Sequence, residues 1–442
     1  MSYLIKRFHS YGAILGLICT ACFLTACANN GPGAGIRWTG YPALASSNTS
    51  YPWLVVKCQV SDVSAIPAGL DTTIQQFFGI SGAGYGNLVD YFHDVSYNRA
   101  SVISDTFVGW IKAPFEQADL SFPNGRLRND RRQRVMECLE AIPTDQFPDL
   151  EAFYGVVVIN NAVQDGGACG LGQVQMTVNK KKYKLACLWF DANSLSTQFA
   201  AHEIGHGLGL DDSFDDSGTL CGGSSDPGRY CDSWDIMSAQ NTYQFDDQNF
   251  VVGDGGPGMS APGLLQMGWL PSDNQRRYDL ETGGEQKFKL RALSRPRGAD
   301  PLMVLLNVGG PGPFDGIYTI EYRQGIGWDR GFVTDLDTPQ VVRSSGGAVF
   351  VHEYRPAGAP TSKLINGKFA GALQPCNTIV VPGSGGLVYH VTVENFDIPD
   401  GSATVSVGSG RGKFILCVSD TVSKDKKFSA RSHTRTDDTF KP

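Results

Sequence analysis

Hydrophobic and polar positions follow two different patterns along the chain, which divide it near residue 278. Before that point, segments with the two-residue period of strands alternate with segments that have helical spacing. The predicted strands of this first part cover 53–60, 101–110 and 153–159, followed by a hairpin of 173–178 and 183–190. Segment 153–159 is apolar on both faces, so we expect it at the centre of a sheet.

Helices are predicted between these strands. They cover 72–78, 86–95, 128–142 and 260–269. A further helix carries residues 202–206, and we expect Asn193 or Ser194 to cap its first turn. Strands, helices and an antiparallel hairpin together predict an α+β domain over 50–278.

Beyond residue 280 the period of two dominates. Short strand candidates separated by Gly/Pro turns cover 287–293, 302–308, 317–323, 348–354, 378–381, 387–393, 403–407 and 414–418. Many short strands at this spacing predict an all-β sandwich domain over 279–420. The remaining residues, 421–442, are polar and are predicted to form a tail.

The N-terminus has the pattern of an export signal. Two basic residues precede an uncharged, mostly apolar run over 13–26, which is too short for a typical membrane-spanning helix. The run ends in Leu-Thr-Ala-Cys, which resembles a bacterial lipobox, so residues 1–27 are predicted to be a lipoprotein signal peptide with Cys27 as the lipidated residue. Residues 28–49 would then be a flexible tether. The alternative is an ordinary signal peptide that is cut after Ala28 and gives a secreted protein.

The composition agrees with an exported globular protein. Of the 442 residues, 41% are hydrophobic and 18% are charged, and the net charge of −7 gives no reason to expect nucleic acid as a partner. We expect a monomer that is attached to an outer membrane or cell surface if Cys27 is lipidated. Eight cysteines follow Cys27, an even number that suggests disulfides in an exported chain. Pairing in sequence order gives Cys58–Cys138, Cys169–Cys187, Cys221–Cys231 and Cys376–Cys417.

The strongest chemical signal is an H-E-x-x-H motif formed by His202, Glu203 and His206. Histidines four residues apart lie on one face of a helix, so both imidazoles can reach one metal ion, with zinc as the ion that the motif predicts. Glu203, next to the first histidine, can act as the general base toward a water at the metal. Gly209 allows a sharp turn after the helix. Asp212 is then placed to return as the third ligand, with neighbouring Asp211 as the alternative.

Three further candidate residues lie downstream of the motif. Met237 lies in a predicted tight turn, where its thioether would form an apolar floor beneath the imidazoles. Tyr230 and Tyr243 flank it and are candidate stabilisers of an oxyanion, although a structural role is the simpler interpretation for both.

Other polar residues are better explained as ordinary surface or strand positions. Calcium is a weaker candidate cofactor, for which the sequence offers Asp215, Asp216, Asp226, Asp232, Asp246, Asp247 and Asp254. These aspartates do not have EF-hand spacing, so solvated loops are the simpler interpretation. His352 and His390 lie on predicted strands and are interpreted as ordinary strand residues.

The motif and its surroundings resemble the metzincin clan of zinc metallopeptidases. Within the clan, the chain is most similar to gametolysin-like and immune-inhibitor-like secreted enzymes, over roughly residues 50–410. The resemblance rests on the zinc motif with Gly209 and Met237, and on the stretches 88–92, 95–97, 108–110, 268–270 and 318–323. It implies a zincin catalytic domain with a mixed sheet and an active-site helix. Most metzincins have His as the third ligand, whereas the Asp at 212 is similar to that of snapalysin-type enzymes.

These observations predict an exported zinc endopeptidase that acts on a protein or peptide substrate. Glu203 would take the proton of the attacking water and pass it to the leaving amine. The hairpin before the metal helix is the candidate edge for an extended substrate. One alternative is a non-catalytic surface binder or adhesin on a metalloprotease fold, although such a protein has no need of a base beside the metal. A glycoprotein- or cell-wall-directed hydrolase is the other alternative, for which no aromatic platform is evident.

Overall fold

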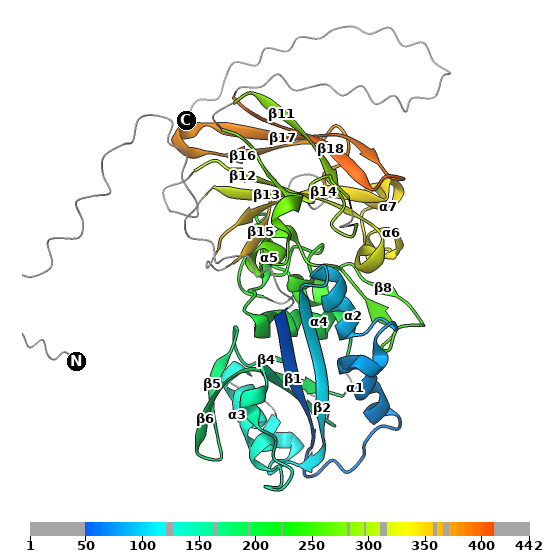
Figure 1. Cartoon of the computed structure of the whole chain (residues 1–442), viewed down its shortest axis with the longest axis vertical. Coiled ribbons are helices and arrows are strands. Elements are labelled where there is room, and N and C mark those ends of the chain that lie inside the picture. The colour runs from blue at the N-terminus through cyan, green and yellow to red at the C-terminus, as the bar shows by residue number, and fades with distance from the viewer. Residues whose placement is uncertain are drawn as a thin grey trace, which may run out of the picture. The chain divides into compact units, whose positions relative to one another are not determined.

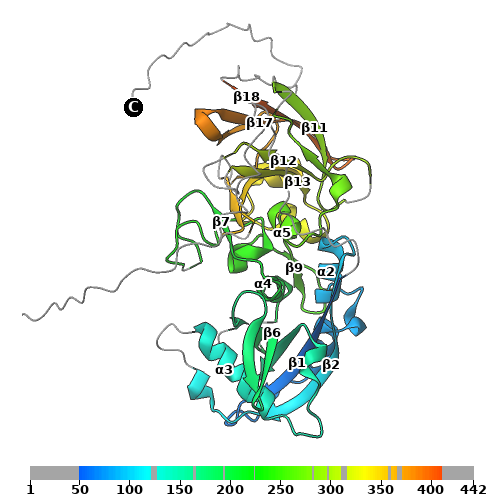
Figure 2. The same ribbon diagram turned by 60° about the vertical axis from the view of Figure 1, so that its left-hand side comes forward.

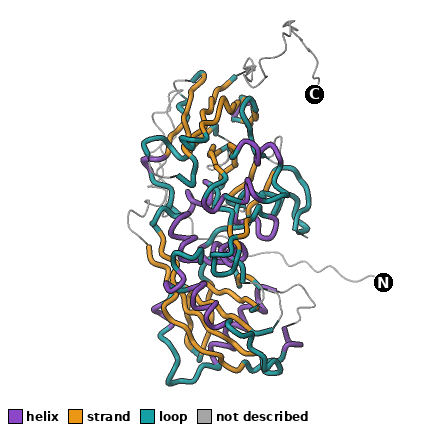
Figure 3. Tube along the Cα trace, turned by 90° about the vertical axis from the view of Figure 1, so that its right-hand side faces the viewer, coloured by secondary structure: helices purple, strands orange, loops and turns teal. Residues whose placement is uncertain are grey.

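The computed structural model describes residues 49–410, with gaps at 121–126, 163–165, 193–194, 223, 281–282, 296–297, 310–315, 357–359 and 366–370. The predicted signal peptide with Cys27, the strand at 414–418 and the tail at 421–442 lie outside the described residues. In the part that is described, no helix is both long and apolar enough to cross a membrane. The fold mixes α and β structure, with several sheets and few helices (Figure 3).

The first sheet has the strand order β2-β1-β3-β6-β4, with β5 also paired to β6 (Figure 1). Its strands are β1 (Thr49–Gln59), β2 (Ala100–Lys112), β3 (Gly155–Asn160), β4 (Gly167–Ala168), β5 (Val174–Val178) and β6 (Lys181–Asp191). The first three strands and β6 run parallel, whereas β4 and β5 pair antiparallel with β6. All residues of β3 are buried and the strand lies between β1 and β6, which confirms its predicted central place.

Helices cover both faces of this sheet. They are α1 (Leu70–Phe78), α2 (Leu88–Val95), α3 (Leu127–Glu140) and α4 (Thr197–Leu208). A further helix, α5 (Ala261–Gln266), follows later in the chain and contacts strands of another sheet. Buried residues of α3, such as Val135 and Leu139, pack with Val156 and Val158 on one face (Figure 2). On the other face α4 comes so close that a Cβ on Gly207 would lie 2.8 Å from the Trp53 ring. The absence of a side chain at residue 207 therefore allows the metal-motif helix to lie against the sheet.

The cap of α4 differs from the prediction. The N-cap is Ser196, whose hydroxyl accepts a hydrogen bond from the amide of Phe199. The prediction of Asn193 or Ser194 was wrong, because the helix begins at Thr197 and a capping side chain must lie directly before the first turn. Asn193 and Ser194 themselves lie outside the described residues.

Two further sheets follow. One has the order β10-β12-β13-β14-β15-β7 and the other β11-β18-β17-β16. Their strands are β7 (Ser213–Asp215), β10 (Gln275–Arg277), β11 (Glu285–Arg291), β12 (Met303–Asn307), β13 (Ile317–Gln324), β14 (Gly347–Tyr354), β15 (Ser362–Leu364), β16 (Thr378–Pro382), β17 (Val388–Asp397) and β18 (Ser402–Ser409). One buried cluster contains residues of both sheets, for example Ile320 and Val351 with Val391 and Val405. The two sheets thus share a hydrophobic core.

The remaining elements are short. A two-stranded sheet consists of β8 (Phe245–Asp246) and β9 (Asp254–Gly255). The helices α6 (Gly331–Thr334) and α7 (Gln340–Ser345) interrupt a region that was predicted to contain only strands. The 3-10 turns are η1 (Ile80–Gly82), η2 (Gln117–Leu120), η3 (Leu150–Ala152), η4 (Ile236–Asn241), η5 (Ser272–Asn274), η6 (Gly327–Asp329) and η7 (Ser384–Gly386). Strand β7 follows Asp212 directly and pairs in parallel with β15.

Three disulfides cross-link the described residues. They join Cys58 to Cys138, Cys169 to Cys187 and Cys221 to Cys231, which are three of the four pairs expected from sequence order. The fourth pair would involve Cys417, which lies outside the described residues. Disulfides of this kind persist in oxidising environments outside the cytosol.

Candidate metal centre

Helix α4 brings the three residues of the H-E-x-x-H motif together. His202, Glu203 and His206 are all buried, and each offers a ligand atom within 4.8 Å of the others. The helix ends at Gly209, which adopts the left-handed conformation (φ 101°) that glycine tolerates without strain. The chain therefore turns sharply after His206, as the sequence predicted, and this buried group could bind a metal ion.

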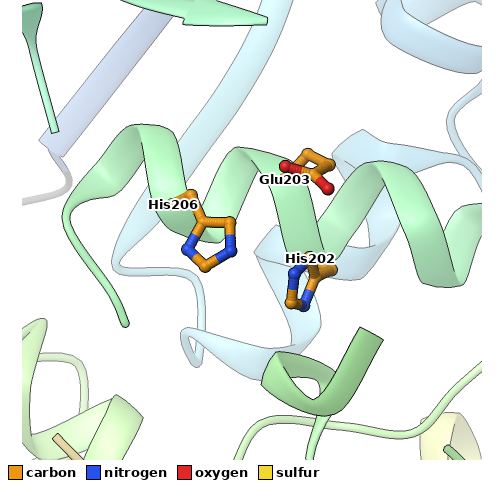
Figure 4. Close-up of side chains that lie close together, drawn as sticks. All are labelled: His202, Glu203 and His206. Atoms are coloured by element: carbon orange, nitrogen blue, oxygen red, sulfur yellow. The ribbon is translucent and has the colours of Figure 1, made fainter. Parts of the chain in front are cut away.

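The two imidazoles lie on the same side of α4 (Figure 4). Their ring centroids are 4.5 Å apart and the rings are nearly perpendicular, at 80°. The Nδ1 atom of His206 lies 2.8 Å from the carbonyl oxygen of Leu210, and that of His202 lies 3.1 Å from the carbonyl of Ile236. A carbonyl oxygen only accepts, so these contacts favour a proton on Nδ1 and leave Nε2 as the ring nitrogen that faces the site. The amide of Ala239 also lies 3.2 Å from Nδ1 of His202, and it can donate to this nitrogen only in the other tautomer.

Asp212 completes this group. Its Oδ1 atom lies 3.1 Å from Nε2 of His206 and 3.5 Å from Nε2 of His202, and the residue is only 1% exposed. This oxygen is buried and accepts no hydrogen bond. Asp211 behaves differently, because its Oδ1 accepts a hydrogen bond from the amide of Asp212. Of the two candidates, the structure places Asp212 against the imidazoles.

The second carboxylate oxygen of Asp212 is held by Arg229. Both Nε and Nη2 of the guanidinium donate to Oδ2, with the Nε bond at 2.8 Å. Burial by itself raises the pKa of the Asp212 carboxyl, but His206, His202 and Arg229 outweigh it and hold that pKa well below its usual range. Asp212 is therefore ionised. Sequence reasoning missed Arg229, because nothing in a 17-residue separation indicates contact with Asp212.

The same surroundings shift the two histidines in opposite directions. Burial and the neighbouring His206 lower the pKa of His202. Burial also disfavours the charged form of His206, but its contact with Asp212 prevails and raises the pKa of His206 above the usual value. The contact with Asp212 thus favours the protonated form of His206, whereas the surroundings of His202 favour its neutral form.

Glu203 is fixed by the edge of the first sheet. Its Oε2 accepts a hydrogen bond of 2.6 Å from the amide of Ala168 in β4. Cys169, the next residue, is cross-linked to Cys187 of β6, which anchors this edge. Ala168 was not singled out from the sequence, since a backbone amide leaves no signature in residue type. The bond orients the carboxylate beside the imidazoles.

Met237 lies in η4, directly against α4. A Cβ placed on Gly205 would lie only 2.6 Å from the Met237 sulfur, so this helix position is filled by the thioether instead. The side chain of Asp235 caps the turn by accepting from the amide of Met237, and it also accepts from the hydroxyl of Ser260. The methionine is 2% exposed and packs against α4 at Gly205, between the two histidines in sequence.

The two tyrosine candidates have different surroundings. The Tyr230 ring lies near the site, 6.4 Å from the His202 ring, with the Arg229 guanidinium 4.9 Å from its centroid. Tyr243 instead packs on Trp234, with ring centroids 4.5 Å apart. Burial raises the pKa of Tyr243 to about 12. Tyr230 therefore lies beside a residue of the motif, whereas Tyr243 packs on Trp234.

The remaining polar candidates form no second metal cluster among the described residues. Asp232 is buried and accepts a hydrogen bond from the Ser213 hydroxyl. His352, which was interpreted as an ordinary strand residue, is fully buried in β14 with Nε2 3.1 Å from Oδ2 of Asp232. His390 lies in β17, where its Nε2 is 2.9 Å from the carbonyl of Gly410.

Comparisons with known proteins add no assignment. The chain matches no known protein family and no curated protein sequence. The chemistry of the site therefore has to be argued from its residues alone.

The raised pKa of His206 predicts a pH-dependent metal affinity. A metal can bind Nε2 only after the proton has left, so affinity should fall about tenfold per pH unit below that pKa. His202 has a lowered pKa and should not compete, so metal uptake should release about one proton rather than two. Calorimetry of the metal-free protein in buffers of different ionisation enthalpy, from about pH 6 to 8, measures both quantities. An affinity that is constant over this range would contradict the prediction.

Proposed function

We propose that this protein is an exported zinc-dependent endopeptidase of the metzincin type. The observation that carries the proposal is the convergence of Oδ1 of Asp212 with Nε2 of His202 and His206, three electron-rich atoms in a buried site. Without a cation between them, such atoms repel one another. A proton or a metal ion makes the arrangement favourable.

The spacing of these atoms fits zinc. Two ligand atoms that are each about 2.0–2.1 Å from a tetrahedral zinc ion lie about 3.4 Å apart. The two nitrogen–oxygen distances here are 3.1 and 3.5 Å. Two imidazoles and one carboxylate also form a ligand set that zinc accepts, and three protein ligands are typical of catalytic sites, whereas structural sites have four. His202, His206 and Asp212 would thus hold the ion.

Glu203 supplies the acid–base chemistry. When bound, zinc polarises the scissile carbonyl and makes a water molecule more acidic. Glu203 takes the proton of the attacking water and then delivers it to the leaving amine. The amide of Ala168 keeps one carboxylate oxygen in place during both transfers. Because Glu203 is a buried base next to the proposed ligands, it supports a catalytic function over that of a non-catalytic surface binder.

The substrate in this proposal is an extended protein segment. Strands β4 and β5 lie at the edge of the first sheet, and β4 reaches Glu203 through Ala168. An edge strand offers unpaired backbone groups to an extended peptide. Lipidation of Cys27 would hold the enzyme at a bacterial outer membrane or cell surface, and cleavage after Ala28 would release it.

The proposal is tested by metal analysis together with proteolysis. The purified mature chain should contain about one zinc ion and should cleave casein, with activity lost on chelation and restored by zinc. Zinc without cleavage of casein or of a peptide library would favour the surface binder. A chain that takes up no zinc would overturn the proposal.

A further inference from the structure

Arg229 acts on the proposed zinc site without reaching the metal. Its Nε and Nη2 atoms both donate to Oδ2 of Asp212, its Nη1 donates to Oδ2 of Asp226 at 3.2 Å, and none of the three contacts Oδ1 of Asp212. A free carboxylate can bind a metal through one oxygen or through both. Here one oxygen is engaged by the guanidinium, and the other faces the two imidazoles.

The local structure presents Arg229 to Asp212. The disulfide Cys221–Cys231 closes the loop that carries the arginine. This loop pairs with the residues that follow Asp212: Phe214 forms a β-bridge with Arg229, and the amide of Tyr230 donates to the carbonyl of Ser213 at 3.0 Å. The arginine side chain is 25% exposed. Two short backbone segments therefore fix both ends of the Arg229–Asp212 contact.

The charge of Arg229 also matters. A carboxylate ligand makes the set of three ligands one unit more negative than three imidazoles would be. The guanidinium is always protonated and lies directly against that carboxylate, so it restores the balance. The same contact thus limits the denticity of Asp212 and offsets its charge.

We infer that Arg229 is a positioning residue that holds Asp212 as a single-oxygen zinc ligand and keeps the fourth coordination position open for water. This inference rests on the proposed function, because it assumes that the site binds zinc. Residues that orient a metal ligand typically contribute 10–100-fold to metal affinity. In the absence of Arg229, Asp212 can turn and bind through both oxygens.

The test replaces zinc with cobalt(II), because the visible absorption of cobalt reports coordination number independently of activity. Four-coordinate cobalt absorbs several times more strongly than five- or six-coordinate cobalt. Wild type should give the intense spectrum, and Arg229→Ala should give a weak one with about 10–100-fold lower zinc affinity in a competition assay with a chelating dye. Arg229→Lys keeps the positive charge but not the paired N–H donors of the guanidinium, so it should give a spectrum of intermediate intensity. This variant also provides the test if Arg229→Ala does not fold.

Two controls separate this role from a merely structural one. Arg355 also donates through Nε and Nη2 to one carboxylate oxygen, Oε1 of Glu353 in β14, and its Nη2 contacts Oε2 as well. Arg355→Ala therefore removes a comparable ion pair and should leave the cobalt spectrum unchanged. The second control adds Arg229→Ala to Asp212→His. The carboxylate is then absent, so removal of the guanidinium should neither weaken the cobalt spectrum nor lower the affinity.

The outcomes are distinct. If wild type binds neither zinc nor cobalt, the proposed function fails and this inference fails with it. If wild type binds metal and cleaves casein, but folded Arg229 variants keep the intense spectrum and the full affinity, only the inference is overturned. An equal effect of Arg229→Ala in the Asp212→His background would also overturn it, because the arginine would then act on the loop and not on the ligand.

Discussion

Replacing Glu203 with glutamine should lower kcat/KM for peptide cleavage by about 10³-fold, or about 4 kcal/mol of transition-state stabilisation, with no loss of zinc. Glutamine has nearly the same shape, and its carbonyl oxygen can still accept the hydrogen bond from the amide of Ala168. It cannot take a proton from water. Steady-state kinetics on a fluorogenic peptide and metal analysis of the same sample measure the two effects separately.

A matched control is available on the surface. Glu285 is exposed on β11, so Glu285→Gln removes the same charge without touching the site and should retain wild-type activity. A Glu203→Gln variant with full activity would falsify the proposed mechanism. A variant that has lost its zinc would instead assign Glu203 to the ligand set, which its hydrogen bond to Ala168 argues against.

Replacing Asp212 with alanine should abolish stable zinc binding and also destabilise the metal-free fold. The substitution removes the third ligand, leaves His206 without its anionic partner and leaves Arg229 with only the exposed Asp226. Loss of one member of a buried ion pair costs about 3–5 kcal/mol, and we expect about 2–3 kcal/mol here. The lower figure reflects solvent screening, because the Arg229 side chain is 25% exposed. Urea unfolding of metal-free wild type and variant measures this difference.

Asp211 provides the control for this experiment. Its carboxylate accepts a hydrogen bond from the amide of Asp212 and is not directed at the imidazoles. The Asp211→Ala variant should therefore still bind zinc and keep most of its stability. Asp212→His should retain zinc, because imidazole is also a zinc ligand. Zinc loss in Asp211→Ala together with zinc retention in Asp212→Ala would show that the ligand had been assigned to the wrong neighbour.

Much of the fold could be predicted from the sequence where the signal is local. The longer strands overlap the predicted segments, and β3 was placed at the centre of a sheet because both of its faces are apolar. The short strands β4, β7, β8, β9, β10 and β15 were not predicted. The short helices α6 and α7 were missed, since one or two turns leave too few positions to show helical spacing. The cap of α4 was misplaced by two or three residues, because several residues before the helix have side chains that can cap.

The sequence by itself determined the histidine and glutamate part of the candidate site. The spacing of His202 and His206 on a helix, with Glu203 beside them, depends only on helix geometry, and the turn at Gly209 depends on the conformational freedom of glycine. Tertiary structure alone decided what holds these residues. Arg229 on Asp212, the Ala168 amide on Glu203 and Asp235 beneath Met237 are all contacts between separate elements. Such contacts have no characteristic spacing, because they arise only when the sheet, the disulfide-closed loop and the helix pack together.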